Sequence, residues 1–248
     1  RPIALNNAEQ NTYRNIETLN QKKSFKTILA VGYLLSQGFY NLGMFEIGPL
    51  EYLYSQNNIE GNRFRIGGRS TQALTDKAYF EGYVAYGLDD TRLKYFLRSA
   101  VSLNGSSVVT FPAHYLEGSI QNDIMEPGQQ IGFLKGDSFF RSIRKNRPTK
   151  WFDTRAYQLQ HVIEFGTTGL THRNQNTVGD LRLINSGNPD LLLTHIQSNE
   201  AHVDLRWAPF EKFYYRNLNR KTIIEKHPVF NLTYTHSLDG FWNTTYAY

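Results

Sequence analysis

The sequence predicts a mainly β protein in which an antiparallel meander forms all or part of a transmembrane-type β-barrel, with a short N-terminal helical segment. Between residues 60 and 103, three consecutive runs of about ten residues place apolar side chains on one face and charged side chains on the other. A strand needs about 9 to 11 tilted residues to cross a bilayer, whereas strands of soluble domains most often have about 5 to 6. The mean hydropathy of −0.50 argues against a transmembrane helix but not against a barrel, because half of the strand residues of a barrel face a polar interior.

We expect the chain to have two parts. Residues 1–41 form a helical preface, because Tyr13, Ile16 and Leu19 recur at helical spacing before a pair of lysines. This preface either packs on the barrel or lies at a membrane surface, where its lysines would favour it. Residues 42–248 form the antiparallel β-barrel segment.

The strand predicted at residues 61–69 carries the clearest division into two faces. Its charged face holds Arg63, Arg65 and Arg69, and its apolar face holds Phe64 and Ile66. An unpaired guanidinium in a confined interior would be strongly destabilising. We therefore expect Arg63 and Arg65 to pair with carboxylates of neighbouring strands, and the first candidates are Glu81 and Glu46.

The same division continues along the later strands. The predicted inward-facing charged ladder consists of Arg63, Arg65, Arg69, Glu81, Lys94, Arg98, Glu117, Glu200, Asp204 and Arg206. The predicted outward apolar face consists of Phe64, Ile66, Tyr95, Leu97, Val101, Leu103, Val203, Leu205 and Trp207. Because charges of both signs occur in the ladder, a salt-bridged interior is favoured over a selective channel.

The remaining elements are less regular. Residues 44–54 read as a strand in which Pro49 indicates an edge or a bulge, because proline lacks a backbone donor. Further strands are predicted at residues 113–121, 157–165, 201–207 and 230–235. Loops are expected at residues 122–135, at residues 166–190 with weak strands between, and at residues 214–227.

Composition excludes several classes of partner and site. The net charge is +5, but the cations are spread along the strands, and the densest basic patch, residues 141–150, reads as a solvated loop. We therefore expect no nucleic-acid partner. The chain has no cysteine, which excludes disulfides and thiolate metal sites.

Motifs for chemistry are weak. Ser142 and Lys145 match the Ser-x-x-Lys spacing of acylating serine enzymes, but the partner motifs are missing. His202 and Asp204 share a strand face with charged neighbours, which favours a polar ladder over catalysis. His161 lies among apolar neighbours and reads as an interface residue. The histidines have no paired metal spacing. We predict no catalytic, cofactor-binding or metal-binding residue and no enzyme activity.

Several sequence blocks resemble a family of outer-membrane proteins from Bacteroidetes. These blocks are residues 58–69 (NIEGNRFRIGGR), 83–87 (YVAYG), 205–209 (LRWAP) and 228–234 (PVFNLTY). Members of the family carry a domain of unknown function and are often labelled carboxypeptidase-like regulatory domain-containing proteins. The resemblance spans nearly the whole chain.

The resemblance implies an outer-membrane location and a longer precursor, of which this chain is a central fragment. It implies outer-membrane lipid and other envelope proteins as partners. The regulatory-domain label refers to an accessory fold and implies no peptidase activity.

Three functional hypotheses follow from the residues and the resemblance. The first is a non-catalytic outer-membrane β-barrel segment with a structural, assembly or transport role in the cell envelope. The second is a soluble antiparallel β-domain that binds a glycan or lipid through exposed aromatic residues. The third and weakest is a hydrolase that uses His202 and Asp204.

Overall fold

The computed structural model describes residues 12–14, 16, 18, 21–25, 27–28, 31–32, 38–129, 132–133, 150–185, 188–216, 219–223 and 227–238. The chain divides into two units, Arg1–Tyr40 and Asn41–Tyr248. The predicted basic patch falls almost entirely outside the described residues, as does the Ser-x-x-Lys motif within it.

The first unit is helical in nearly all of its described residues between positions 12 and 32. Within it, Thr18 Oγ1 donates a hydrogen bond of 2.8 Å to the carbonyl oxygen of Arg14, four residues earlier. Thr27 makes the same bond to Lys23 at 3.0 Å. None of the helical stretches that the structure describes combines the length and hydropathy of a membrane-spanning helix.

The second unit contains an 11-stranded antiparallel sheet and a separate two-stranded sheet. The large sheet consists of β1 Tyr40–Asn41, β2 Phe45–Ile47, β3 Tyr54–Asn57, β4 Gly61–Ser70, β5 Ala78–Gly87, β6 Leu93–Ser102, β7 His114–Met125, β8 Lys150–Phe165, β9 Leu170–Asn185, β10 Asn188–Trp207 and β13 Phe230–Ser237. The small sheet pairs β11 Lys212–Arg216 with β12 Asn219–Ile223.

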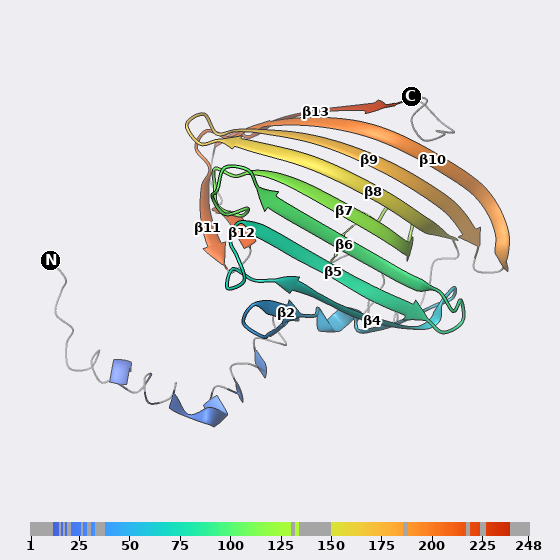
Figure 1. Cartoon of the computed structure of the whole chain (residues 1–248), viewed down its shortest axis with the longest axis horizontal. Helices are drawn as coiled ribbons and strands as arrows, with labels where there is room; N and C mark the ends of the chain where they lie inside the picture. Colours follow the sequence, from blue (N-terminus) through green and yellow to red (C-terminus); the bar gives the residue numbers. More distant parts are fainter. Residues whose placement is uncertain are drawn as a thin grey trace. The chain divides into compact units, whose positions relative to one another are not determined.

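From β4 to β10 each strand pairs with the next one in the chain, and β13 then pairs with β10 (Figure 1). This is the predicted antiparallel meander. Short connections, such as those between β5 and β6 and between β8 and β9, favour antiparallel pairing, because antiparallel strands can be joined by a tight turn. Within the described residues no pairing joins β13 to the first strands, so this part of the sheet is open.

The first edge of the sheet is interrupted. Both β2 and β3 pair with β4, at opposite ends of that strand. Between them lies the short 3-10 helix η1, Leu50–Tyr52, whose N-cap is Pro49. The strand predicted over residues 44–54 is therefore broken at Pro49, which lies in neither β2 nor β3, because proline cannot donate to a ladder at this point.

Three regions predicted as loops, one of them with weak strands, contain regular strands. Residues 166–190 supply all of β9 and the start of β10, and β9 pairs along nearly its whole length with both neighbours. The polar run at residues 174–177 has no apolar alternation, so cross-strand pairing rather than local sequence determines its structure. Residues 122–125 extend β7, and residues 214–227 contain most of the β11–β12 hairpin.

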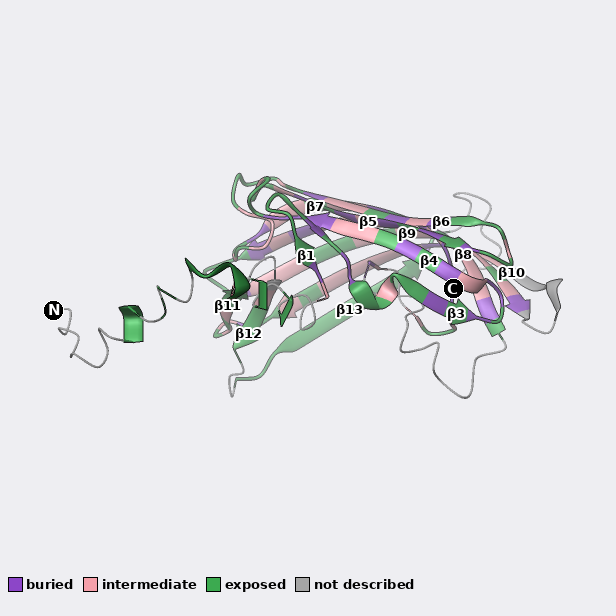
Figure 2. Cartoon of the chain, turned by 90° about the horizontal axis from the view of Figure 1, so that it is seen from below, coloured by how far each residue is buried: buried purple, intermediate pink, exposed green. Residues whose placement is uncertain are grey.

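Buried and exposed residues alternate along β4 to β6 (Figure 2). We call the side of the sheet that carries Arg63, Glu81 and Lys94 the charged face, and the side that carries Phe64 and Leu97 the apolar face. Directly opposite residues of paired strands lie on the same side of a sheet. The register therefore extends both faces from β4 to β10.

Buried apolar residues lie in two places in the described part of the chain: on the charged face, as with Tyr83, Phe96 and Val162, and in a small cluster at one end of the strands. Ile59, Ile124, Trp151 and Ile184 come together where β4 and β8 begin and where β7 and β9 end. This cluster closes one end of the strands, but it does not cover either face of the sheet along its length.

Two glycines on the apolar face test how tightly the strands pack. A Cβ atom at Gly82 would lie 2.7 Å from the backbone oxygen of Phe96, whereas one at Gly118 would have nothing within 4 Å. We expect Gly82→Ala to lower the free energy of unfolding by about 1 to 3 kcal/mol. Gly118→Ala should change it by less than about 0.5 kcal/mol. Denaturant titration of the two variants checks this, and equal losses would contradict the packing described here.

Candidate functional site

The predicted inward ladder lies on the charged face in the register of the sheet. Arg69 stands opposite Glu81, Glu81 opposite Arg98, and Arg98 opposite Ser119 on the next strand. The fully buried members are Arg63, Arg65, Arg69, Glu81 and Lys94. The half-buried members are Arg98, Glu117, Glu200, Asp204 and Arg206.

Arg63 is the centre of a buried ion network. Its side chain is 1% exposed. Its Nη1 atom lies 2.9 Å from Glu60 Oε2 and 2.8 Å from Asp123 Oδ1, and its Nη2 donates to Asp123 Oδ2 at 2.8 Å. The planar fork of arginine allows this two-pronged contact with one carboxylate while it serves a second one.

Lys94 joins the same network from β6. Its Nζ lies 2.6 Å from Glu60 Oε1 and also contacts the Asp90 carboxylate. Glu60 is 0% exposed and accepts a further hydrogen bond of 2.7 Å from the Asn57 amide. The turn before β4 thus supplies the carboxylate that both cations share.

Arg65 is held mainly by aromatic rings. Its guanidinium carbon lies 3.6 Å from the ring centroid of Tyr83, 4.6 Å from that of Tyr52 and 5.5 Å from that of Phe133. Its Nη2 donates to the backbone oxygen of Phe133. The Tyr83 hydroxyl in turn donates to Asp123 at 2.6 Å, which links Arg65 to the network.

The predicted carboxylate partners of Arg63 and Arg65 are wrong. Glu46 binds Arg69, with 2.6 Å between Oε2 and Nη2, and Glu81 binds Arg98 at 2.9 Å. The predictions considered only carboxylates close to β4. The Arg63 side chain instead extends across the charged face and bonds to Asp123 on β7, three strands away. Strands lie about 4.8 Å apart, so this contact requires the sheet to curve around its charged face.

A second group of charges lies further along the charged face. Arg98 also approaches Glu117, at 3.8 Å, and the Tyr79 hydroxyl donates to Glu81 at 2.5 Å. On β10, Arg206 makes a two-pronged bond to Glu211, at 2.6 and 2.7 Å. The described charges of this face are therefore largely engaged with one another.

The pair proposed for hydrolysis is engaged in polar contacts of the same kind. His202 Nε2 lies 3.2 Å from Glu200 Oε2, and its Nδ1 lies 2.9 Å from Thr235 Oγ1. Asp204 stands opposite Arg173 and Thr233 in the register. The arrangement is that of a cross-strand polar ladder.

Sequence reasoning missed the acidic half of the Arg63 network. Glu60 enters the sequence analysis only as part of the block at residues 58–69, and Asp123 falls in the loop predicted at residues 122–135. The signal for Asp123 was available, because it continues the alternation of Glu117, Ser119 and Gln121 on the charged face of β7. No sequence pattern pointed to Phe133.

The apolar face is exposed over most of its area. Phe64, Ile66, Leu97, Val101, Leu103, Leu205 and Trp207, all predicted to face outward, are each more than a third exposed, and Tyr95 and Val203 are half-buried. Other exposed apolar residues continue this face on the same strands. They are Phe80, Val84, Tyr86, Leu93, Leu116, Ile120, Tyr157, Leu159, Phe165, Phe230, Leu232 and Tyr234.

The apolar face has defined limits along the strands. On β8 and β9 it ends beyond Tyr157, where Arg155 stands opposite Asp180 and Asp153 stands opposite Arg182. At the other end of the strands Trp207 stacks on Phe230, with 5.7 Å between ring centroids. Charged residues therefore replace apolar ones at one border, and aromatic residues mark the other.

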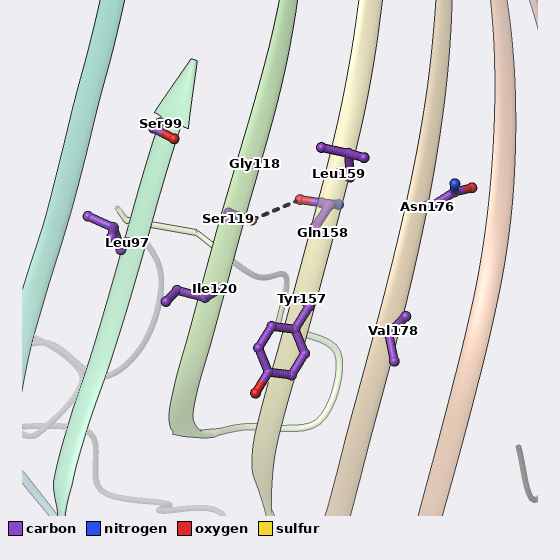
Figure 3. Close-up of a pocket in the computed structure, with 10 residues that line it drawn as sticks. All are labelled: Leu97, Ser99, Gly118, Ser119, Ile120, Tyr157, Gln158, Leu159, Asn176 and Val178. Carbon is purple, nitrogen blue, oxygen red and sulfur yellow. Dashed lines mark hydrogen bonds between the residues drawn. The ribbon is translucent and has the colours of Figure 1, made fainter. Parts of the chain in front are cut away.

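The apolar face contains a shallow hollow of about 350 Å³ (Figure 3). Leu97, Ile120, Tyr157, Leu159 and Val178 surround it, and Gly118 contributes no side chain. Because the lining is mostly apolar and the hollow is open, it is a recess in an apolar surface rather than a catalytic cleft.

The described part of the chain contains no group of three or more histidine, aspartate or glutamate residues that could hold a metal ion.

His161, predicted to be an interface residue, lies on the apolar face and contacts His114, with 2.9 Å between their Nε2 atoms. Two imidazoles in this position can share one hydrogen bond.

Comparison of the chain with models of protein families, with curated proteins and with solved structures gives no match. The interpretation of both faces therefore depends on the residues and their geometry.

Removing the central cation tests the buried network. We expect Arg63→Met to lower the free energy of unfolding by about 3 to 5 kcal/mol, because Glu60 and Asp123 would lose a shared buried partner. The matched control is Arg92→Met, which breaks the half-exposed pair with Asp153 and should cost no more than about 1 kcal/mol. Thermal or denaturant unfolding measures both. Similar small losses would mean that the network is not a stabilising centre.

Proposed function

We propose that the sheet is part of the wall of an outer-membrane β-barrel, with a structural or assembly role in the cell envelope and no catalytic activity. The observation that carries this proposal is the inverted burial of the two faces. Arg63, Lys94 and Glu60 are buried, whereas Phe64, Ile66 and Leu97 are each more than half exposed. A soluble sheet packs its apolar face on a core and leaves its charged face in water.

The length of the apolar face along the strands supports contact between this face and a membrane. It runs over residues 93–101 on β6 and residues 157–165 on β8, in line with the about 9 to 11 tilted residues that a strand needs to cross a bilayer. Aromatic residues near both ends of the strands, such as Phe64 at one end and Trp207 at the other, fit the aromatic girdles of outer-membrane barrels. A continuous exposed apolar surface of this size would promote aggregation in water.

The paired charges support a structural role over a conducting one. The network around Arg63 combines three cations, Arg63, Arg65 and Lys94, with three carboxylates, Glu60, Asp90 and Asp123. Such a neutral, bonded interior stabilises a barrel wall, whereas a selective pore needs charges that are free to meet the permeating ion. The resemblance to the Bacteroidetes outer-membrane family agrees with this role, and outer-membrane lipid is the proposed partner of the apolar face.

Partitioning separates this proposal from the soluble glycan-binding or lipid-binding alternative. The protein should require detergent for extraction and should migrate differently on gels before and after heating, because folded barrels resist detergent. A protein that stays monodisperse without detergent would contradict the membrane assignment. Exposed aromatic residues such as Trp207 and Phe230 would then become the candidates for ligand stacking.

An arginine introduced on the apolar face should destabilise the protein if that face contacts lipid, and should have little effect if it contacts water. Leu97→Arg lies near the middle of the face, and it should cost about 2 to 4 kcal/mol in a bilayer. Val101→Arg, nearer the border, should cost less. In water, an arginine at such an exposed position changes stability by no more than about 0.5 kcal/mol. Reversible unfolding from vesicles measures the difference, and equal tolerance at both positions would argue against lipid at this face.

A further inference from the structure

Among the residues that the structure describes, the β11–β12 hairpin has no backbone pairing with the large sheet. It forms a two-stranded sheet of its own, which lies near one end of the large sheet (Figure 1). Its register pairs Phe213 with Thr222 and Tyr215 with Arg220, so these four side chains share one face. Lys212, Tyr214, Lys221 and Ile223 occupy the other face and are exposed. On the first face Phe213 and Arg220 are half-buried, whereas Tyr215 and Thr222 are exposed.

Contacts between the hairpin and the residues around it use the first of these two faces. The ring centroids of Phe213 and Phe111 are 5.1 Å apart. The Tyr215 hydroxyl accepts a hydrogen bond of 3.1 Å from the backbone nitrogen of Phe111. Thr222 donates to Glu211 at 2.8 Å. Through this face the hairpin therefore docks against the loop that contains Phe111.

The strongest of these contacts is the ion pair between Arg220 and Glu164. Arg220 Nη1 donates to Glu164 Oε2 at 2.8 Å, and Nη2 contacts Oε1, which makes the bond two-pronged. Glu164 lies on the charged face near the end of β8, where its side chain is 4% exposed and also accepts a bond from the Ala113 backbone nitrogen at 2.8 Å. The Arg220 guanidinium lies 4.5 Å from the Phe213 ring centroid.

We propose that the β11–β12 hairpin is a lid over the charged face at the end where β8 finishes, and that the Glu164–Arg220 ion pair is its latch. Because the attachments that carry the docking are side-chain contacts, the hairpin can swing away without breaking a ladder hydrogen bond of the large sheet. Opening would expose Glu164 and the end of the charged face around it. The proposal concerns the second unit alone, so it stands whether or not the apolar face meets lipid.

A second ion pair holds the base of the lid. Arg206 on β10 binds Glu211, which directly precedes β11. The hydrogen bond from Arg206 lowers the pKa of the Glu211 carboxyl, so this anchor stays ionised at neutral pH. The lid thus has a fixed base at Glu211 and a separate latch at Glu164, which are the parts that a hinged element requires.

The absence of cysteine from the chain allows single thiols to report the lid position. Phe213→Cys places a thiol on the docked face, and Tyr214→Cys places one on the outer face as the matched control. In the purified full chain, a water-soluble maleimide should label position 213 at least tenfold more slowly than position 214. Adding Glu164→Gln should raise the rate at position 213 toward the control and leave position 214 unchanged.

Two further variants keep the test decisive. Arg220→Gln removes the latch from the hairpin side and leaves the Glu164–Ala113 bond, so it serves if Glu164→Gln does not fold by circular dichroism. Arg92→Gln breaks an ion pair elsewhere and should not affect labelling at position 213. Equal rates at positions 213 and 214 in the parent chain would show that the hairpin is not docked. A slow rate at position 213 that survives loss of the latch, or one that Arg92→Gln also raises, would overturn the latch.

Discussion

The two-residue period of a β-strand is the constraint on which the structure depends. Once Arg63 faces one side of β4, Phe64 must face the other, and pairing carries this division from strand to strand. A shift of one residue in any pairing would bring charges to the apolar face. The register is thus specified on both sides at once, by ion pairs on one face and by apolar contacts on the other.

Buried charge becomes tolerable in this sheet because it is collected into networks. Glu60 alone serves Arg63, Lys94 and the Asn57 amide. Burial of an isolated ion would cost several kcal/mol, whereas each of these groups exchanges water for a charged partner at hydrogen-bond distance. The aromatic cage around Arg65 serves the same end, since ring faces attract a guanidinium.

Much of the sheet could be predicted from the sequence, but the partners of its charges could not. The strands at residues 61–69 and 93–103 alternate so regularly that face and period are readable directly. The polar strand β9 falls where the sequence predicts only weak strands within a loop, because its structure depends on its two neighbours, which a local pattern does not encode. The bond between Arg63 and Asp123 spans 60 residues and depends on sheet curvature, so alternation alone suggested nearer carboxylates. The β11–β12 hairpin lies mostly within a predicted loop, because each of its strands has only five residues and shows no long alternation.

The long-range bond between Arg63 and Asp123 also bears on the order in which the chain folds. Most ladders in the sheet join neighbours in sequence, so hairpins such as β5–β6 can form early and locally. Asp123 meets Arg63 only after β4, β5, β6 and β7 have all assembled and curved. Until then the Asp123 carboxylate has to stay in contact with water, because burying it without Arg63 would be destabilising. An intermediate in which β7 is only partly covered is therefore disfavoured. These four strands are therefore expected to become stable together, as one cooperative unit, rather than one hairpin at a time.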